Sequence, residues 1–388
     1  MNFIITSPYF PVNFQNFALR MAERGIRVLG IGQEPYDQLG DDLRAALTEY
    51  FRVDDMEDYE EVARAAAFLY YKHGKISGLE SHNEHWLPLD AYVRRALNIK
   101  GLRPEDLEKT KYKSAMKKYF KSAGVPVLAG YVVKNEAEAQ KAIRDLSYPV
   151  VAKPDSGVGT GGTYRIEDER DLENFLGVWY QETPYFIEPF ISDARLITYD
   201  GLVDFDGDII FETSFTYGRP TLEYAEEKYD VAFTVTPDID PILRDYGRAA
   251  VKSFGMRGRF FHIEFFKKAD GTYLALEYNN RPGGGNTIDV YNHAFEIDLY
   301  DIYARMVAGE KLSPLGKAKH YSIGLSQRDI YSYAHYEEAI RKAYKDKVKE
   351  AYRLPEGFSE LMGDTMYSII ADSKEEVEEI IDFVHLHK

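Results

Sequence analysis

The sequence predicts an α/β protein that begins with a parallel-sheet domain and ends with a small α/β appendage. Two observations predict this class. Over residues 1–100, short apolar runs alternate with amphipathic stretches, as in parallel βαβ units. Further along, turn residues that include Asp-Gly separate pairs of apolar runs twice, which is a hairpin signal. The chain therefore combines a parallel sheet with antiparallel hairpins.

The composition excludes several classes of function. A chain of 388 residues with 45% hydrophobic residues is long and apolar enough for two or three globular domains. A net charge of −16 argues against nucleic acid or an anionic membrane as the main partner. The absence of cysteine excludes disulfides, thiolate catalysis and zinc–cysteine sites.

The N-terminal residues do not resemble a targeting segment. Residues 1–8 lack a basic region and the apolar run breaks at Pro8, unlike a signal peptide. No apolar run approaches the roughly 20 residues that a membrane span needs. We expect a soluble, cytoplasmic protein without a membrane partner.

The first region should form βαβ units. We expect strands at 2–7, 26–31 and 75–79 and helices at 16–23 and 59–71. The loop after the first strand has no glycine fingerprint, so a dinucleotide cradle is not expected there.

A polar run, Glu80–Trp86, follows the third of these strands. The carboxyl ends of strands in open α/β sheets usually bind ligands, so the run is interpreted as a loop facing a substrate. The alternative is the capped start of a helix. His82 and His85 are spaced i, i+3, which does not match a zinc-binding helix.

A lysine-rich helical stretch at 110–123 ends at Gly124-Val125-Pro126. We expect most of its lysines to form a solvated face, with the alternative that one of them reaches a ligand. The pattern leaves the choice open among Lys111, Lys113, Lys117, Lys118 and Lys121.

Residues 148–166 combine a strand with a glycine-rich loop. Lys153 ends an apolar β run, and the loop that follows contains Gly157, Gly159, Gly161 and Gly162. Glycines let backbone N–H groups close on a phosphate, and a lysine supplies a point charge. This is not a Walker motif, because no Gly-Lys-Ser/Thr follows and no helix begins there. The loop is a candidate phosphate contact.

Residues 185–191 read as a buried strand interrupted by Glu188-Pro189. Proline is confined to strand edges or ends, so we expect this strand to leave backbone polar groups free along one edge. Such an edge is suited to hydrogen-bond a flat nucleotide base. A second hairpin follows at 204–208, with its acids as turn residues.

The segment 262–285 holds the most informative hairpin. Two apolar runs flank Asp270-Gly271, and a two-residue loop there would pair Ala269 with Thr272. Counting outward from that pair places Glu264 opposite Glu277. A three-residue loop would turn one strand over and separate these carboxylates, so the prediction depends on the register.

Two opposed carboxylates repel each other, so the pair predicts a cation between them. Asn279 shares the face of Glu277, because side chains alternate along a strand. Mg²⁺ takes carboxylate and amide oxygens and leaves sites for phosphates. Arg281 and Gly283–Gly285 follow and are suited to meet the anion that the metal holds. The alternative is an exposed hairpin with solvated acids.

Beyond this hairpin the pattern predicts a helix at 292–308 and a small α/β appendage. The appendage should contain a strand from 322, a helix at 336–347, strands near 351 and 367, and a helix at 374–385.

Over roughly residues 101–311, the order of the motifs resembles the ATP-grasp superfamily of the carboxylate–amine ligase type. The matching features are a lysine before Gly-Val-Pro, Lys153 with its glycine-rich hairpin, Glu188-Pro189-Phe190-Ile191, Glu264, and Glu277-x-Asn279-x-Arg281. The resemblance implies an ATP-grasp fold after an N-terminal Rossmann-like domain. The expected division is an N-terminal domain at 1–105, a small subdomain with the phosphate loop at 106–187, a large subdomain with the metal site at 188–312, and the appendage at 313–388.

The resemblance also implies roles for residues. Two lysines and the glycine loop would hold the ATP phosphates, and the strand at 185–191 would hold adenine through the Pro189 carbonyl and the Ile191 N–H. The implied nucleotide-binding residues are Lys113, Lys153, Gly157, Gly159, Gly161, Glu188, Pro189 and Ile191. Many members carry an acid for the ribose seven residues after this glutamate, where this chain has Arg195, and Asp193 is a candidate substitute.

By the same resemblance, Glu264, Glu277 and Asn279 would bind Mg²⁺ or Mn²⁺. Arg281 and Lys153 would be catalytic, with Arg281 stabilising the transferred phosphoryl group or an acyl phosphate.

The function that the resemblance implies is ATP-dependent ligation of a small carboxylate to an amine through an acyl phosphate, releasing ADP and phosphate. One alternative is a biotin-carboxylase-like or carbamoyl-phosphate-synthase-like enzyme that uses bicarbonate. Another is a nucleotide-binding module without turnover. The sequence leaves the two substrates unnamed and leaves a homodimer open.

Overall fold

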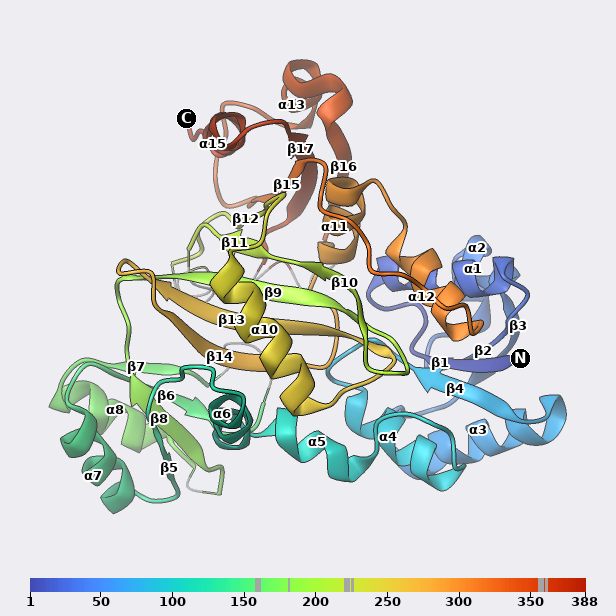
Figure 1. Ribbon diagram of the computed structural model, residues 1–388, viewed down its shortest axis with the longest axis horizontal. Coiled ribbons are helices and arrows are strands. Elements are labelled where there is room, and N and C mark those ends of the chain that lie inside the picture. Colours follow the sequence, from blue (N-terminus) through green and yellow to red (C-terminus); the bar gives the residue numbers. More distant parts are fainter. Residues whose placement is uncertain (158–161, 181, 220–223, 225–226, 355–358, 360–361) are drawn as a thin grey trace.

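A computed structural model describes residues 1–157, 162–180, 182–219, 224, 227–354, 359 and 362–388. The described residues form a parallel sheet at the N-terminus, a small antiparallel sheet, and a large sheet that runs through the middle of the molecule (Figure 1). The predicted α/β class is confirmed. Among the described helices, none is long and apolar enough to cross a membrane.

The N-terminal sheet is parallel, in the order β3-β2-β1-β4. Its strands and helices are β1 (Asn2–Thr6), α1 (Gln15–Glu23), β2 (Arg27–Gly32), α2 (Asp41–Ala46), β3 (Leu47–Arg52), α3 (Tyr59–His73), β4 (Ile76–Glu80) and α4 (Leu87–Ala96). The predicted strands and helices are confirmed, and α2 and β3 were not predicted. In β3 only Leu47 is buried, so this edge strand lacks the apolar pattern that marks the others.

The small sheet is antiparallel, in the order β5-β8-β6-β7. Its strands and the helices around them are α5 (Pro104–Lys111), α6 (Lys113–Ser122), β5 (Tyr131–Val133), α7 (Glu136–Leu146), β6 (Val150–Pro154), β7 (Tyr164–Ile166), α8 (Glu169–Val178) and β8 (Tyr185–Pro189). The strands predicted on both sides of the glycine loop are confirmed.

The single helix predicted at 110–123 is wrong, because the chain breaks into α5 and α6 at Tyr112. Tyr112 is extended, with φ −105° and ψ 124°, and forms a bridge with Ser156. The first residue of α6, Lys113, donates its backbone N–H to the Asp155 carbonyl at 2.8 Å. The Asp155 carboxylate accepts the next N–H, from Ser114, at 2.8 Å. The break therefore fixes the start of α6 beside the glycine loop.

The large sheet has the order β14-β13-β9-β11-β12-β15-β17-β16, and β10 also pairs with β9. Its strands are β9 (Ala194–Val203), β10 (Ile209–Thr213), β11 (Phe215–Tyr217), β12 (Ala232–Val235), β13 (Arg259–Lys268), β14 (Tyr273–Asn279), β15 (Tyr321–Gln327), β16 (Val348–Arg353) and β17 (Thr365–Ala371). Helix α10 (Pro241–Phe254) lies across one face (Figure 1). The hairpin at 204–208 is confirmed, and the Asp204 carboxylate accepts three backbone N–H groups in its turn.

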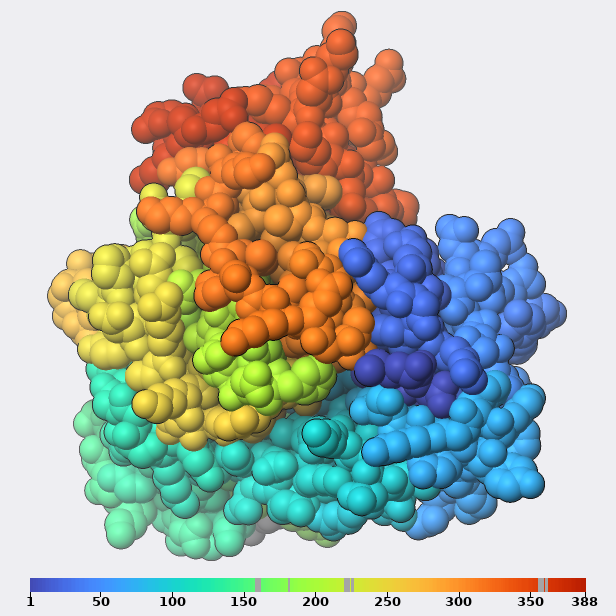
Figure 2. All heavy atoms as spheres, turned by 45° about the vertical axis from the view of Figure 1, so that its right-hand side comes forward, coloured from blue at the N-terminus to red at the C-terminus, as the bar shows by residue number. Residues whose placement is uncertain are grey.

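The helix predicted at 292–308 is also two helices, α11 (Thr287–Phe295) and α12 (Leu299–Val307). Glu296 adopts a left-handed conformation that ends α11, and the Asp298 carboxylate caps α12. Helix α12 packs against α1, and Arg20 and Asp298 form an ion pair at 2.6 Å between them. Figure 2 shows this orange region directly against the dark blue N-terminal segment.

The C-terminal strands continue the large sheet, because β15 pairs with β12 on one side and β17 on the other. Helices α13 (Glu337–Tyr344) and α15 (Lys374–Val384) accompany them. The predicted C-terminal elements are confirmed, except that a 3₁₀ turn at Lys345–Lys347 replaces the end of the first helix. The junction is packed tightly, since an added Cβ at Gly324 of β15 would lie 2.3 Å from the Phe233 ring of β12.

We predict that Gly324→Ala lowers the free energy of unfolding by about 1–3 kcal/mol, because the buried Phe233 must move. Urea unfolding measures the change. Gly316→Ala is the matched control, since a Cβ there meets nothing within 4 Å, and it should change stability by less than about 0.5 kcal/mol. Equal stability of the two variants would show that this junction is loosely packed.

Candidate active site

The β13–β14 hairpin places Glu264 opposite Glu277, as predicted, but by a different route. The loop has three residues, not two, because Lys268 and Thr272 are joined by backbone hydrogen bonding across it. A β-bulge corrects the register, since Glu277 pairs with Glu264 while Ala275 pairs with Phe265 and Leu276 is the extra residue. The predicted loop length is therefore wrong, and the predicted carboxylate pair is right.

The bulge is anchored by the small-sheet part of the chain. The Ala275 N–H donates to the Pro126 carbonyl at 2.8 Å, and the Ala275 carbonyl accepts from Lys117 at 3.3 Å. Both partners come from or directly follow α6. The register of the hairpin and the position of α6 are thus coupled.

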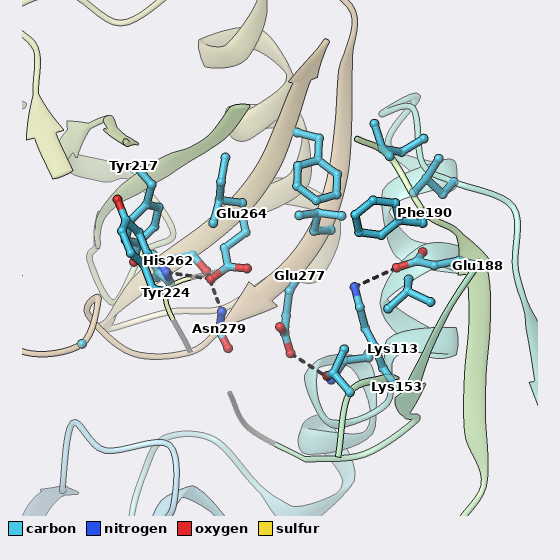
Figure 3. Close-up of a pocket in the computed structure, with 18 of the residues that line it drawn as sticks. Lys113, Lys153, Glu188, Phe190, Tyr217, Tyr224, His262, Glu264, Glu277 and Asn279 are labelled. Atoms are coloured by element: carbon cyan, nitrogen blue, oxygen red, sulfur yellow. Dashed lines mark hydrogen bonds and ion pairs between the residues drawn. The ribbon is translucent and has the colours of Figure 1, made fainter. Parts of the chain in front are cut away.

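A pocket of about 260 Å³ lies between the small sheet and the large sheet. It brings together groups from α6, β6, β8, β13 and β14, and Figure 3 shows basic side chains facing acidic ones across it. The predicted residues that line it are Lys113, Lys153, Glu188, Pro189, Ile191, Glu264, Glu277, Asn279 and Arg281. The exposed hairpin with solvated acids is ruled out by this arrangement.

Three oxygen-bearing side chains of the hairpin suit a hard divalent cation. Glu264 and Glu277 are opposed, and Asn279 donates its amide N–H to the His262 carbonyl at 3.4 Å, which leaves its amide oxygen as an acceptor. The described residues contain no group of three or more His, Cys, Asp and Glu side chains suited to a metal. Two carboxylates and an amide still fit Mg²⁺, which keeps sites for phosphate oxygens and water.

His262 was not predicted, and it orients the first of these carboxylates. Its Nδ1 lies 2.5 Å from Asp200 and its Nε2 lies 3.4 Å from Glu264. Burial lowers the pKa of His262, but Asp200 and Glu264 outweigh burial and raise the pKa to about 9. A charged imidazole therefore sits between two carboxylates. Strand alternation, which puts His262 on the face of Glu264, is the signal that could have found it.

At the opposite wall, two lysines share one buried carboxylate. Glu188 lies 3.0 Å from Lys153 and 2.9 Å from Lys117. Burial raises the pKa of Glu188, but the two lysines outweigh burial and lower the pKa to about 2. Of the lysines left open on the 110–123 stretch, Lys117 is buried here. Lys117 is not among the residues that the resemblance implied. It could have been found from its spacing, since residues four apart on a helix, such as Lys113 and Lys117, lie on the same face.

Lys113, the first residue of α6, bridges the two walls. Its Nζ lies 3.4 Å from Glu277 and 3.4 Å from the Gly157 carbonyl. Gly157 has φ +144°, a backbone conformation open to glycine. Gly159 and Gly161, also expected in the phosphate loop, lie outside the described residues.

Pro189 is the last residue of β8, as expected for a proline at a strand end. The free polar edge predicted along this strand is wrong for residues 185–187, which pair with β5. Pro189 pairs with Val150 on the β6 side. Asp193 and Arg195 are exposed and lie outside the described residues that line the pocket, so a ribose contact from either stays a prediction.

The polar run at 80–86 contributes one carboxylate to this region. Glu84 Oε2 lies 3.3 Å from Arg281 Nε, and burial raises the pKa of Glu84, partly offset by Arg281. The two histidines of the run do not join it. His82 is buried with its ring stacked on Phe17 at 3.8 Å, and His85 pairs with Glu57 at 2.6 Å. The N-terminal region therefore reaches the site by holding Arg281.

This fold and this pocket define an ATP-grasp protein, as the resemblance implied. Residues 112–315, just over half of the chain, match the family described as carbamoyl-phosphate synthase L chain, ATP binding domain. The chain belongs to that family.

Curated relatives are distant and mostly longer. The carbamoyl phosphate synthase large chain of Agathobacter rectalis is 22% identical over 247 residues, which is 62% of this chain and 22% of that protein. An uncharacterized protein, y4rH, of Sinorhizobium fredii is 24% identical over 276 residues, which is 69% of this chain and 53% of that protein. The match therefore spans about a fifth to a half of these relatives.

Solved structures share the fold over nearly the whole chain. An L-amino acid ligase from Bacillus licheniformis has a TM-score of 0.73 at 18% identity and covers 98% of this chain and 97% of its own. N5-carboxyaminoimidazole synthetase from Staphylococcus aureus has a TM-score of 0.71 at 14% identity, and the match covers 98% of this chain and 96% of that chain. A third structure is the biotin carboxylase domain of 2-oxoglutarate carboxylase from Hydrogenobacter thermophilus, in complex with MgADP, ADP and bicarbonate. It has a TM-score of 0.70 at 17% identity, and the match covers 100% of this chain and 90% of that chain.

We predict that Lys117→Met destabilises the protein strongly, near the lower end of the about 3–5 kcal/mol expected for breaking a buried pair, because Lys153 still compensates Glu188. Chemical unfolding measures this loss. Lys118→Met is the matched control, since Lys118 is exposed on the same helix. If both variants unfold alike, the Lys117–Glu188 contact contributes nothing to stability.

Proposed function

We propose that this protein is an ATP-dependent ligase that joins a carboxylate to an amine through an acyl phosphate and releases ADP and phosphate. The observation that supports it is the facing of two groups across one pocket. Lysines from α6 and β6 lie opposite the Glu264–Glu277 pair, and Arg281 lies at the same pocket. Such a pocket suits a polyphosphate with metal on one side and cations on the other.

The proposed reaction has two steps. A carboxylate oxygen attacks the γ-phosphorus of ATP, ADP leaves, and an acyl phosphate forms. The amine then attacks the acyl carbon, and phosphate leaves with the bridging oxygen. No protein nucleophile is needed, so catalysis would come from positioning and charge stabilisation.

Each wall would have a distinct task. Lys113 and Lys153 would neutralise the phosphates, and release of Lys153 from Glu188 would let it face the nucleotide. Pro189 and Ile191 would meet adenine through their backbone carbonyl and N–H groups. Mg²⁺ or Mn²⁺ held by Glu264, Glu277 and Asn279 would supply charge neutralisation for the transferred phosphoryl group.

Bicarbonate is the second candidate for the acid, because bicarbonate stands with MgADP in the Hydrogenobacter structure and carbamoyl phosphate synthases are among the relatives. That candidate predicts bicarbonate-dependent release of ADP. A nucleotide-binding module without turnover predicts no substrate-stimulated release with any acid.

Arg281→Lys is the sharpest test of turnover in this pocket. An arginine grips a developing phosphoryl or acyl phosphate with two parallel hydrogen bonds, which a lysine cannot reproduce. We expect kcat to fall by about 10²-fold or more while the Kd of ATP stays within about twofold. Phosphate release with hydroxylamine present measures kcat, and an acyl phosphate is trapped as the hydroxamate.

The control is Arg257→Lys, at an exposed position outside the pocket lining, which should leave both quantities unchanged. ATP hydrolysis without hydroxamate across a broad screen of acids would contradict the acyl-phosphate mechanism.

A further inference from the structure

The pocket has a second end beyond the hairpin that carries Glu264 and Glu277. On the side away from Glu188 and Phe190, Figure 3 shows Tyr217 and Tyr224 next to His262 and Glu264. Together with three further lining residues these tyrosines make an apolar wall, here called the aromatic lobe. It consists of Tyr217, Tyr224, Val231, Phe233 and Met362.

We propose that the carboxylate substrate carries a large apolar side chain, aromatic above all, which the aromatic lobe holds. This inference rests on the proposed ligase function, since it names the acid that the same site would activate.

The lobe is built from packed rings. The centroids of Tyr217 and Phe233 are 6.1 Å apart and those of Tyr217 and Tyr224 are 6.5 Å apart. Phe233 and Tyr224 are 1% and 2% exposed, so their positions are set by the fold. The Tyr224 hydroxyl donates to the Ala232 carbonyl at 3.1 Å and accepts from the Arg219 N–H at 3.0 Å. Tyr224 and Phe233 therefore form the fixed backing of the lobe, and the half-buried Tyr217 and Met362 supply most of its open surface.

Two polar side chains beside the lobe, His262 and Thr287, already have partners. Both ring nitrogens of His262 face carboxylates, and the Thr287 hydroxyl donates to the Gly283 carbonyl at 2.7 Å. The lobe thus offers a ligand ring faces, a valine, a thioether and the phenol of Tyr217. Burying apolar ligand surface against these walls is favourable. In pockets of this kind, a few polar groups fix the orientation of the ligand. Bicarbonate is too small and polar to cover these walls.

The lobe lies close enough to the reacting groups to position the acid and not a remote part of the nucleotide. Phe215 lies between Tyr217 and His262, since its ring centroid is 5.0 Å from that of Tyr217 and 5.9 Å from that of His262. Tyr217, His262 and Glu264 line the same part of the pocket (Figure 3). A carboxylate bound at Arg281 would extend its side chain into the lobe.

One described residue of the C-terminal region, Met362, borders this end of the pocket. Met362 lines the lobe, and an added Cβ at Gly285 would lie 2.6 Å from the Met362 Cε. The Met362 side chain therefore packs on the glycine turn that follows Arg281. The appendage would act in acid selection through this contact.

The test measures binding of acids by calorimetry to the full-length protein with Mg²⁺ and a non-hydrolysable ATP analogue. The probes are 3-phenylpropionate and L-phenylalanine against acetate, glycine and bicarbonate. We expect the aromatic acids to bind at least about tenfold more tightly, since one methylene in a fitted pocket discriminates by about tenfold or more. Tyr217→Ser and Met362→Ser should each remove most of that preference while the Kd of the analogue changes less than about twofold.

Tyr71→Ser is the matched control, because Tyr71 is 89% exposed on α3 and lines no part of the pocket. Two variants are used so that the misfolding of one, seen as a lowered Tm, leaves the other to decide. Equal or tighter binding of the small acids, or an unchanged preference in folded variants, would overturn the proposal. A requirement for an apolar amine instead of an apolar acid would overturn it too.

Measuring ADP release and hydroxamate formation with hydroxylamine present distinguishes failure of this proposal from failure of the proposed ligase function. If the aromatic acids bind with the expected preference and no acid stimulates ADP release, the ligase function fails and the lobe assignment stands. If bicarbonate or acetate supports hydroxylamine-trapped turnover best, the ligase function stands and the lobe assignment fails.

Discussion

The site depends on two like charges that a β-hairpin holds face to face. Glu264 and Glu277 are opposed on neighbouring strands, where carboxylates repel. Compensation comes from both sides, since His262 lies 3.4 Å from one and Lys113 lies 3.4 Å from the other. The imidazole belongs to the same strand, whereas the lysine belongs to α6. The opposed pair therefore links the large sheet electrostatically to the helix that precedes the small sheet.

The facing wall of the pocket also pairs its charges, but there two cations share one anion. There one carboxylate, Glu188, lies between Lys153 and Lys117, and the lysines keep it ionised despite its burial. Buried charges remain only where they are paired, and the carboxylates of both walls are paired with side chains of this chain. Binding of a metal–polyphosphate would exchange these internal partners for ligand atoms. Lys117, which is also bonded to the bulged strand, would stay with Glu188 during that exchange.

The sequence revealed much of the fold and of the site because the relevant signals are local. Apolar runs predicted β1, β2, β4 and the hairpin strands, and the motif order led to Glu264 and Glu277 at one pocket. The helix breaks at Tyr112 and Glu296 were missed because neither position carries glycine or proline. The contacts that hold the break at Tyr112, with Asp155 and Ser156, are also distant in sequence. The bulge at Leu276 was also missed because its contacts are distant in sequence. It depends on Pro126 and Lys117, which no count along the hairpin includes. Glu84 lies in the run predicted to face a substrate, but its contact with Arg281 was missed, as was the contact of His262 with Glu264.

The most direct measurement of the central claim follows an oxygen atom. With 3-phenylpropionate labelled with ¹⁸O in its carboxylate, and with hydroxylamine as the amine, the acyl-phosphate mechanism transfers one labelled oxygen to the phosphate released from ATP. Mass spectrometry of that phosphate should show one ¹⁸O for each hydroxamate formed. Phosphate that carries only oxygen from ATP and from water, at the same rate of ADP release, would contradict the mechanism.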